Sequence, residues 1–185
     1  KVALQSGIDL VIELPVLYAT SSAENFADGS IKILDSLKDV DYLAFGAEIA
    51  DINTLSSVST ILNDEPKEFK TLLAQELQKG LSFPKSRENA IVSYFENDKK
   101  YAKILSAPNN ILGIEYIKAL KKHKSKIEPV AIKRYEAGYN DLTYSGNIAS
   151  ATAIRNIVKN NGFNILQNLM PESTYSALTQ NIQNG

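Results

Sequence analysis

Two short apolar runs on either side of a helix-like segment most limit how this chain can fold. Residues 9–15 and 41–46 lack the alternation of apolar and polar residues that marks a half-exposed strand. Such runs are typical of parallel strands that are covered on both faces. Residues 21–37 between them carry small and apolar residues at helical spacing, and we expect Ser21 to cap this helix with Glu24 in a capping box. Strand, helix and strand in this order predict a βαβ unit, and hence an α/β fold with a parallel sheet.

The middle of the chain changes character before the sheet pattern returns. Residues 51–126 carry helical patterns and no convincing strand, with helices expected over about 64–80, from Ser86 onward and over 113–122. Residues 127–134 then predict another strand. The chain is therefore expected to insert a helical segment between strands of one sheet.

The last part of the chain is expected to be a loop followed by helices. Residues 136–147 are polar and rich in Gly, Asn, Asp and Tyr, which is typical of a loop. Ser150 is expected to cap a helix that ends near Asn161 and Gly162. Residues 165–180 predict a helical tail that breaks at Pro171.

The amino-acid composition excludes several classes of functional site. The chain of 185 residues has no cysteine, which excludes disulfides and thiolate chemistry, and its single histidine, His123, excludes a multi-histidine metal site. We therefore expect no metal ligands. The formal net charge of −1 does not by itself demand a nucleic-acid partner. No apolar run approaches the roughly 20 residues that span a bilayer, and the start is not a signal peptide, so we expect a cytoplasmic protein. The chain begins at Lys1 and not at Met, so we treat it as part of a longer protein.

Three candidate ligand contacts follow predicted strands or precede a helix, where open α/β sheets bind ligands. Gly46 ends the second strand and would let a ligand approach the backbone. Asn109 and its neighbour Asn110 can cap a helix or offer amide groups to a nucleotide. Arg134 ends the last strand and could bind a phosphate in a bidentate manner. A turn glycine, a helix cap and a solvated arginine are the simpler alternatives.

A fourth candidate is the start of the helix after Ile148. Free N–H groups and the positive end of the helix dipole make such a turn suited to an anion. The hydroxyls of Ser150 and Thr152 add donors, and Arg155 adds charge one turn later. The alternative is a plain serine-capped helix with an exposed arginine.

Two further groups could contact RNA. The basic residues at the end of the helix over 113–122 could meet a phosphate backbone, although a solvated helix end is the simpler interpretation: Lys121, Lys122 and Lys124. The tyrosines of the polar loop could stack on bases, or could simply anchor that loop: Tyr135, Tyr139 and Tyr144.

Taken in order, five segments resemble the bacterial tRNA(Met) cytidine acetate ligase family. They are residues 9–15, residues 19–29, Phe-Gly-Ala-Glu at 45–48, Pro-Asn-Asn-Ile-Leu-Gly at 108–113 and Ile-Ala-Ser-Ala-Thr-Ala-Ile-Arg at 148–155. The last segment is also similar to the Ser/Thr-x-Ile-Arg signature of the wider nucleotidyltransferase superfamily. The resemblance covers residues 1 to about 180.

The resemblance implies a fold, a reaction and a set of partners. The fold would be α/β, with a Rossmann-like parallel sheet of the nucleotidyltransferase type whose N-terminal strands lie outside this chain. Residues 1–50 and 127–162 would form the nucleotide-binding domain, 51–126 a helical insertion, and 163–185 the start of a helical C-terminal region. The reaction would join acetate to ATP as acetyl-adenylate and then acetylate the wobble cytidine of elongator tRNA(Met). Whether Mg²⁺ accompanies ATP stays open.

The resemblance also implies which residues contact ATP, and it leaves one element missing. The resemblance implies that Gly46, Asn109 and Arg134 contact ATP. It also implies that the turn at the start of the last motif contacts the phosphates of ATP through Ser150, Thr152 and Arg155. Family members carry a His-x-Gly-His type motif after their first strand, which these 185 residues do not contain. We therefore assign no catalytic residue, and we expect this stretch of chain alone to be inactive or nearly so. A small-molecule adenylyltransferase and a non-catalytic nucleotide- or RNA-binding module remain alternatives.

Overall fold

The structure is a computed structural model that describes residues 1–134, 149–160 and 164–183, and the chain divides into two compact units. One unit contains Leu14–Arg134, and the other contains Lys1–Glu13 with the described part of Tyr135–Gly185. The larger unit holds, in order, α2 (Val16–Ala19), α3 (Ala23–Leu37), β1 (Tyr42–Ala47), α4 (Ile52–Asp64), α5 (Lys67–Gln78), α6 (Phe83–Tyr94), α7 (Lys99–Leu105), α8 (Pro108–His123) and β2 (Glu128–Lys133). The smaller unit holds α1 (Val2–Gln5), α9 (Ala151–Asn160), the 3₁₀ helix η1 (Asn164–Asn168) and α10 (Glu172–Gln183).

The sheet of the described chain consists of β1 and β2, which pair in parallel from Tyr42 opposite Glu128 to Ala47 opposite Lys133. This confirms the predicted strands over 41–46 and 127–134 and the predicted parallel α/β class. The connection between them is the helical segment α4–α8, as expected for a parallel pair, which needs a long crossover.

One face of this sheet packs on α8. Phe45 and Ala47 point to the buried face, and Gly113 of α8 lies directly against the Phe45 ring. A Cβ at position 113 would lie 2.4 Å from Phe45 Cε2, so only glycine allows this approach. The side chains that alternate to the other face, Tyr42 and Ile132 among them, are 64% and 55% exposed.

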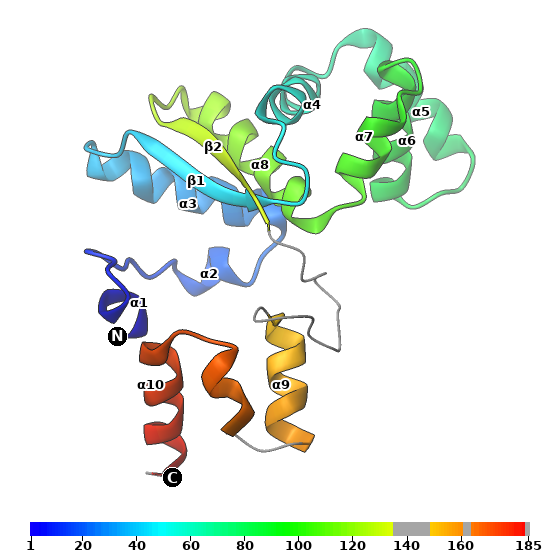
Figure 1. Cartoon of the computed structure of the whole chain (residues 1–185). Coiled ribbons are helices and arrows are strands. Elements are labelled where there is room, and N and C mark those ends of the chain that lie inside the picture. The colour runs from blue at the N-terminus through cyan, green and yellow to red at the C-terminus, as the bar shows by residue number, and fades with distance from the viewer. Residues whose placement is uncertain (135–148, 161–163, 184–185) are drawn as a thin grey trace. The chain divides into compact units, whose positions relative to one another are not determined.

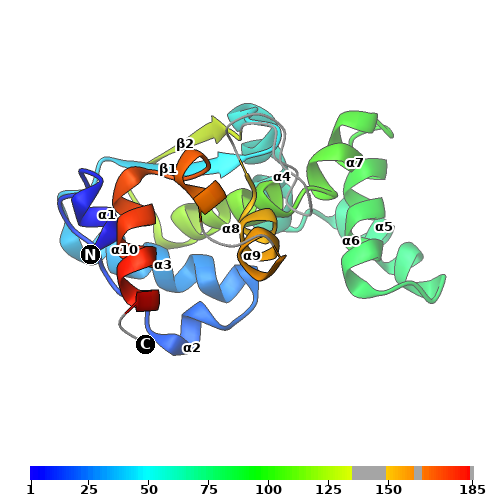
Figure 2. The same ribbon diagram turned by 60° about the horizontal axis from the view of Figure 1, so that its bottom comes forward.

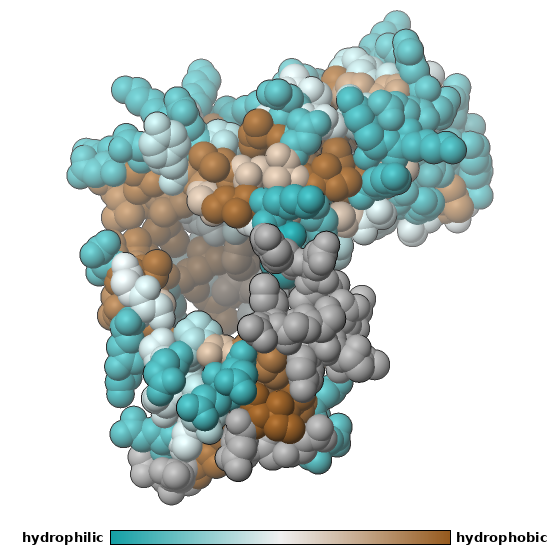
Figure 3. All heavy atoms as spheres, in the orientation of Figure 1, coloured by the Kyte–Doolittle hydropathy of each residue, from teal (hydrophilic) through white to brown (hydrophobic). Residues whose placement is uncertain are grey.

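The main core lies between β1, α4 and α8 and continues into the group formed by α5, α6 and α7. Its fully buried side chains include Leu55, Phe69, Ile91, Ile104 and Ile114. Figures 1 and 2 both show α5, α6 and α7 grouped together to one side of the sheet. The face of this group seen in Figure 3 is mostly hydrophilic, as expected for helices whose apolar sides face one another.

A second cluster joins α3 to the far end of α8, and a chain of ion pairs reinforces the same contact. Lys118 of α8 lies 2.7 Å from Glu24 of α3 and 3.0 Å from Glu115, and Glu115 lies 3.3 Å from Arg87 of α6. The side chain of Glu115 is only 3% exposed. Burial alone would lower the pKa of Lys118, but the hydrogen bond to Glu24 and the charge of Glu115 raise it above its usual range. These charges therefore hold three helices together.

The segment 9–15 does not form the strand that its apolar run predicts. Leu10, Val11 and Ile12 are 65%, 56% and 42% exposed. A strand requires a neighbour that accepts and donates its backbone hydrogen bonds, and among the described residues β1 and β2 pair only with each other. The βαβ unit therefore runs from β1 through the helices to β2, and the predicted first strand is wrong for the described chain.

Several helix starts also differ from those predicted. Ser22, and not Ser21, is the N-cap of α3, and its Oγ accepts from Asn25 N–H, so the predicted capping box with Glu24 is wrong. Helix α6 begins at Phe83, with a proline in its first turn where proline fits best. Ser86, predicted to start this helix, is buried inside it.

The smaller unit is held by a few buried side chains. Ile157 of α9 packs with Leu166 and Leu169, and Ser6 Oγ at the end of α1 lies 3.0 Å from Ser173 Oγ of α10. The cap at Ser150 and the helical tail interrupted at Pro171 are both confirmed. No helix in the described ranges is long and apolar enough to cross a membrane.

Candidate functional site

The carboxyl end of the parallel pair brings together Gly46 and Arg134. Arg134 N–H donates to the carbonyl of Ala47 at 2.9 Å, which continues the β2 hydrogen-bond pattern past the end of the strand. Its side chain lies over Gly46, where an added Cβ would be 3.2 Å from Arg134 Cγ. Gly46 itself is exposed. A bare backbone stretch beside a guanidinium is a surface that a phosphate or a planar ring can approach.

The residues that follow β1 cap the helix that carries Asn109. Glu48 Oε1 accepts from Asn109 Nδ2 at 2.6 Å and from Asn109 N–H at 3.3 Å, and Glu48 Oε2 accepts from Asn110 N–H at 3.1 Å. Both asparagines therefore lie inside the first turn of α8, which begins at Pro108 and not at Gly113. The simpler alternative, in which the asparagines cap the helix, does not hold, because a carboxylate 61 residues away in sequence caps it.

The carboxylate of Glu48 fixes the orientation of the Asn109 amide. An ionised carboxylate only accepts, so the Asn109 nitrogen must face it, and Oδ1 faces the other way. Burial disfavours the ionised form of Glu48, but hydrogen bonds from the Asn109 side chain and from backbone N–H groups outweigh it and lower its pKa. The acceptor oxygen of Asn109 is therefore directed away from Glu48, and one N–H of its amide is already engaged.

Asn110 is a structural residue of this cluster. It is fully buried, and its Oδ1 accepts from Ile49 N–H at 3.2 Å. Its Nδ2 has no hydrogen-bond partner among the described residues. Sequence reasoning treated the pair of asparagines together, whereas the structure separates them into one buried residue and one partly exposed residue.

The smaller unit carries the other predicted contacts. Ser150 Oγ accepts from Ala153 N–H at 3.0 Å at the start of α9. Thr152 Oγ1 accepts from Arg155 Nη2 at 3.4 Å, and Arg155 is exposed. The three predicted side chains thus share the first turns of one helix, and their binding role stays a prediction. Tyr135, Tyr139 and Tyr144 lie outside the described residues.

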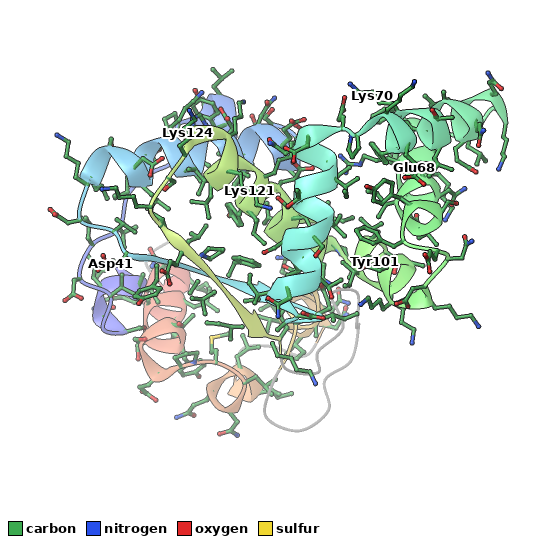
Figure 4. All side chains as sticks on the ribbon, turned by 90° about the horizontal axis from the view of Figure 1, so that it is seen from above. Asp41, Glu68, Lys70, Tyr101, Lys121 and Lys124 are labelled. Atoms are coloured by element: carbon green, nitrogen blue, oxygen red, sulfur yellow. The ribbon has the colours of Figure 1, made fainter. Side chains whose placement is uncertain are left out.

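The three lysines proposed for RNA differ in what they contact. Lys121 Nζ donates to the Ser56 carbonyl at 3.0 Å and to Thr60 Oγ1, both on α4, and Figure 4 shows it beside that helix. Lys122 lies 2.9 Å from Asp28. Hydrogen bonds from Lys32 and then from Lys122 hold the pKa of Asp28 well below its usual range. Lys124, which begins the connection to β2, makes no ion pair with a described residue.

The chain matches one family model over its whole length. Residues 1–185 match the model of the HIGH nucleotidyl transferases. The chain is 49% identical over 185 residues to the tRNA(Met) cytidine acetate ligase of Caldanaerobacter subterraneus subsp. tengcongensis and 46% identical to that of Clostridium novyi, covering 100% of this chain and 46% of each relative. The chain therefore spans about half the length of the curated relatives it matches.

Solved structures of Thermotoga maritima TmcAL are similar to the structure of this chain. Its apo form superimposes with a TM-score of 0.94 at 38% identity, covering 100% of this chain and 44% of that one. Its form bound with alpha-thio ATP gives 0.88 at 36% identity, covering 99% and 43%. The resemblance predicted from the five segments is confirmed, as is the nucleotidyltransferase-type fold. The chain belongs to the HIGH nucleotidyl transferase family.

Proposed function

We propose that this chain carries the ATP-binding part of a ligase that forms acetyl-adenylate and acetylates the N4 amine of the wobble cytidine of elongator tRNA(Met). The observation that carries the proposal is the cluster at the carboxyl end of β1 and β2, where Gly46, Arg134 and Asn109 come from three elements. Relatives that cover the whole chain are named tRNA(Met) cytidine acetate ligases, and the related TmcAL was solved with an ATP analogue.

Each member of the cluster offers a different group to ATP. Arg134 supplies a fixed positive charge for a phosphate, and Gly46 leaves the strand end open to close approach. Asn109 supplies an acceptor oxygen, which suits a ribose hydroxyl or an amine of the base. Considered by itself, the start of α9 in the smaller unit offers the hydroxyls of Ser150 and Thr152, N–H groups and the charge of Arg155 to an anion such as a phosphate.

The proposed chemistry needs positioning and charge neutralisation. An acetate oxygen attacks the α-phosphorus of ATP, pyrophosphate leaves, and acetyl-adenylate forms. The cytidine N4 amine then attacks the acetyl carbonyl carbon, AMP leaves with the bonding electron pair, and the amine loses a proton. Positioned arginines, hydroxyls and helix N–H groups stabilise the phosphate charge in the first step. This agrees with a chain that carries no cysteine nucleophile.

The test is a substitution of Arg134 in the full-length protein, with its neighbour Lys133 as the matched control. Lys133 is also an exposed cation at the end of β2, but adjacent side chains of a strand point to opposite faces. With ATP, acetate and elongator tRNA(Met), nucleoside analysis should show N4-acetylcytidine with the unsubstituted protein and with Lys133→Ala. We expect Arg134→Ala to lower kcat/KM for ATP by about 10² to 10³, the cost of about 3–4 kcal/mol of charge stabilisation. No acetylcytidine from the unsubstituted protein would refute the proposal.

A further inference from the structure

A cavity of about 400 Å³ lies at the opposite end of the sheet from the Gly46 and Arg134 cluster. It is lined by four segments: the last turn of α3, the residues just before β1, the end of α8 and the connection into β2. Its lining includes three apolar residues, Leu34, Val40 and Ile127. In Figure 4, two labelled residues lie at this end of the unit: Lys124, just after α8, and Asp41, just before β1. None of the residues assigned above to ATP lines it.

Three lysines line this cavity without an ion pair to any described residue. Lys38 is the C-cap residue of α3, Lys124 is that of α8, and Lys126 precedes β2. All three are exposed, and within the described ranges none forms a side-chain hydrogen bond. The neighbouring Lys118, Lys121 and Lys122 are each engaged by a partner. The lining of the cavity therefore includes three cations that form no ion pair with a described residue.

Of the acidic residues at this end of the unit, Asp35 lines the cavity, whereas Asp39, Asp41 and Glu128 are exposed and do not line it. Asp35, which lines it, accepts a hydrogen bond from Ser125 Oγ at 2.5 Å. Asp28 is engaged by Lys32, Lys122 and His123. With the three lysines and Asp35 charged, the charged side chains that line the cavity, His123 aside, sum to 3 − 1 = +2. Such a surface complements a polyanion better than a neutral or cationic partner.

We propose that this cavity, with Lys38, Lys124 and Lys126, binds the phosphate backbone of the tRNA substrate, outside the nucleotide to be acetylated. This inference rests on the proposed function, because it takes tRNA as the polyanion. The six residues of β1 span five steps of about 3.3 Å, so the cavity lies about 17 Å from the Gly46 and Arg134 end. A nucleic-acid stem covers that distance in a few base pairs. A base held at the ATP edge therefore places neighbouring phosphates within reach of these lysines.

The test measures tRNA affinity of the full-length protein at several salt concentrations. The variant is Lys38→Gln, Lys124→Gln and Lys126→Gln together, titrated against fluorescently labelled elongator tRNA(Met). The matched control removes the same charge from exposed lysines of α5 and α7, by Lys67→Gln, Lys99→Gln and Lys103→Gln. A second variant carries arginine at positions 38, 124 and 126, which keeps the charge and checks that the site tolerates substitution.

We expect the glutamine variant at the cavity to raise the Kd for tRNA at least about tenfold at 0.1 M salt. Its slope of log affinity against log salt should fall by about 2 to 3, close to one for each phosphate that a lysine no longer neutralises. The arginine variant and the control should stay within about twofold of the unsubstituted protein. An unchanged Kd for the glutamine variant, or an equal loss of affinity in the control, would overturn the inference. An unsubstituted protein that binds tRNA but never acetylates it would instead refute the proposed function.

Discussion

Replacing Glu48 by alanine tests whether a distant carboxylate holds the start of α8. The substitution removes the acceptor of three hydrogen bonds, two from backbone N–H groups in the first turn and one from the Asn109 amide. Loss of an N-cap costs about 0.5–2 kcal/mol, and loss of a carboxylate near a helix N-terminus costs about 0.3–1 kcal/mol. Because Glu48 is partly exposed, we expect a total loss of about 1–3 kcal/mol in the free energy of unfolding.

The assay is chemical denaturation of the full-length protein, followed by circular dichroism. Glu68→Ala is the matched control, because Glu68 is an exposed acid in the first turn of α5 that forms no hydrogen bond with a described residue. It should change the free energy of unfolding by less than about 1 kcal/mol. Glu48→Gln should fall between the two, because the amide keeps one acceptor oxygen but turns a donor toward Asn110 N–H.

The pH dependence gives an independent check on Glu48. Its pKa is lowered in the folded protein, so the stabilisation is fully present above the pKa of an unfolded glutamate and is lost as the pH falls through the folded value. The difference in stability between the unsubstituted protein and Glu48→Ala should therefore be largest near pH 7 and shrink below about pH 4. A difference under about 0.5 kcal/mol at pH 7, or one that does not change on acidification, would refute the reasoning.

Two further substitutions test the packing of α8 by the same denaturation assay. Gly113→Ala should destabilise the protein by about 1–2 kcal/mol, because overpacking against Phe45 exceeds the gain in helix propensity. The double variant Gly113→Ala with Phe45→Leu should lose less stability than the sum of the two single variants. If the two losses simply add, the steric clash is not the cause. Glu115→Ala should cost about 2–3 kcal/mol, below the usual range for a broken buried pair because the Arg87 side chain is 26% exposed. A cost under about 1 kcal/mol would mean that the ion pairs of Glu115 contribute little.

The sequence predicted the elements well where the pattern is local. The apolar runs at 41–46 and 127–134 become β1 and β2, and the helical periodicity of 51–126 becomes α4–α8. The run at 9–15 has the same local character, yet it forms no strand in the described chain, because pairing depends on a neighbour that local composition does not specify. Helix starts were wrong by up to five residues for a similar reason: Pro108 begins α8 under a cap supplied by the segment after β1.

The candidate site was predictable in part. Gly46 and Arg134 each follow a predicted parallel strand, and the carboxyl ends of such strands meet at one edge, so their proximity could be expected. The role of Glu48 was not predicted, because its contacts with Asn109 span 61 residues and only the Phe-Gly-Ala-Glu segment around it was noted. An acidic residue two positions after a strand-ending glycine, opposite a helix start, is the signal that could have pointed to it.

The pairing of β1 with β2 also has a consequence for how the protein folds. Tyr42 and Glu128 are partners across the sheet although 128 − 42 = 86 residues separate them in the chain. Closing so long a loop costs conformational entropy that the ladder alone cannot offset, so the intervening helices must collapse first. In pulsed hydrogen exchange during refolding, amides of α5 and α6 should therefore become protected before those of β1.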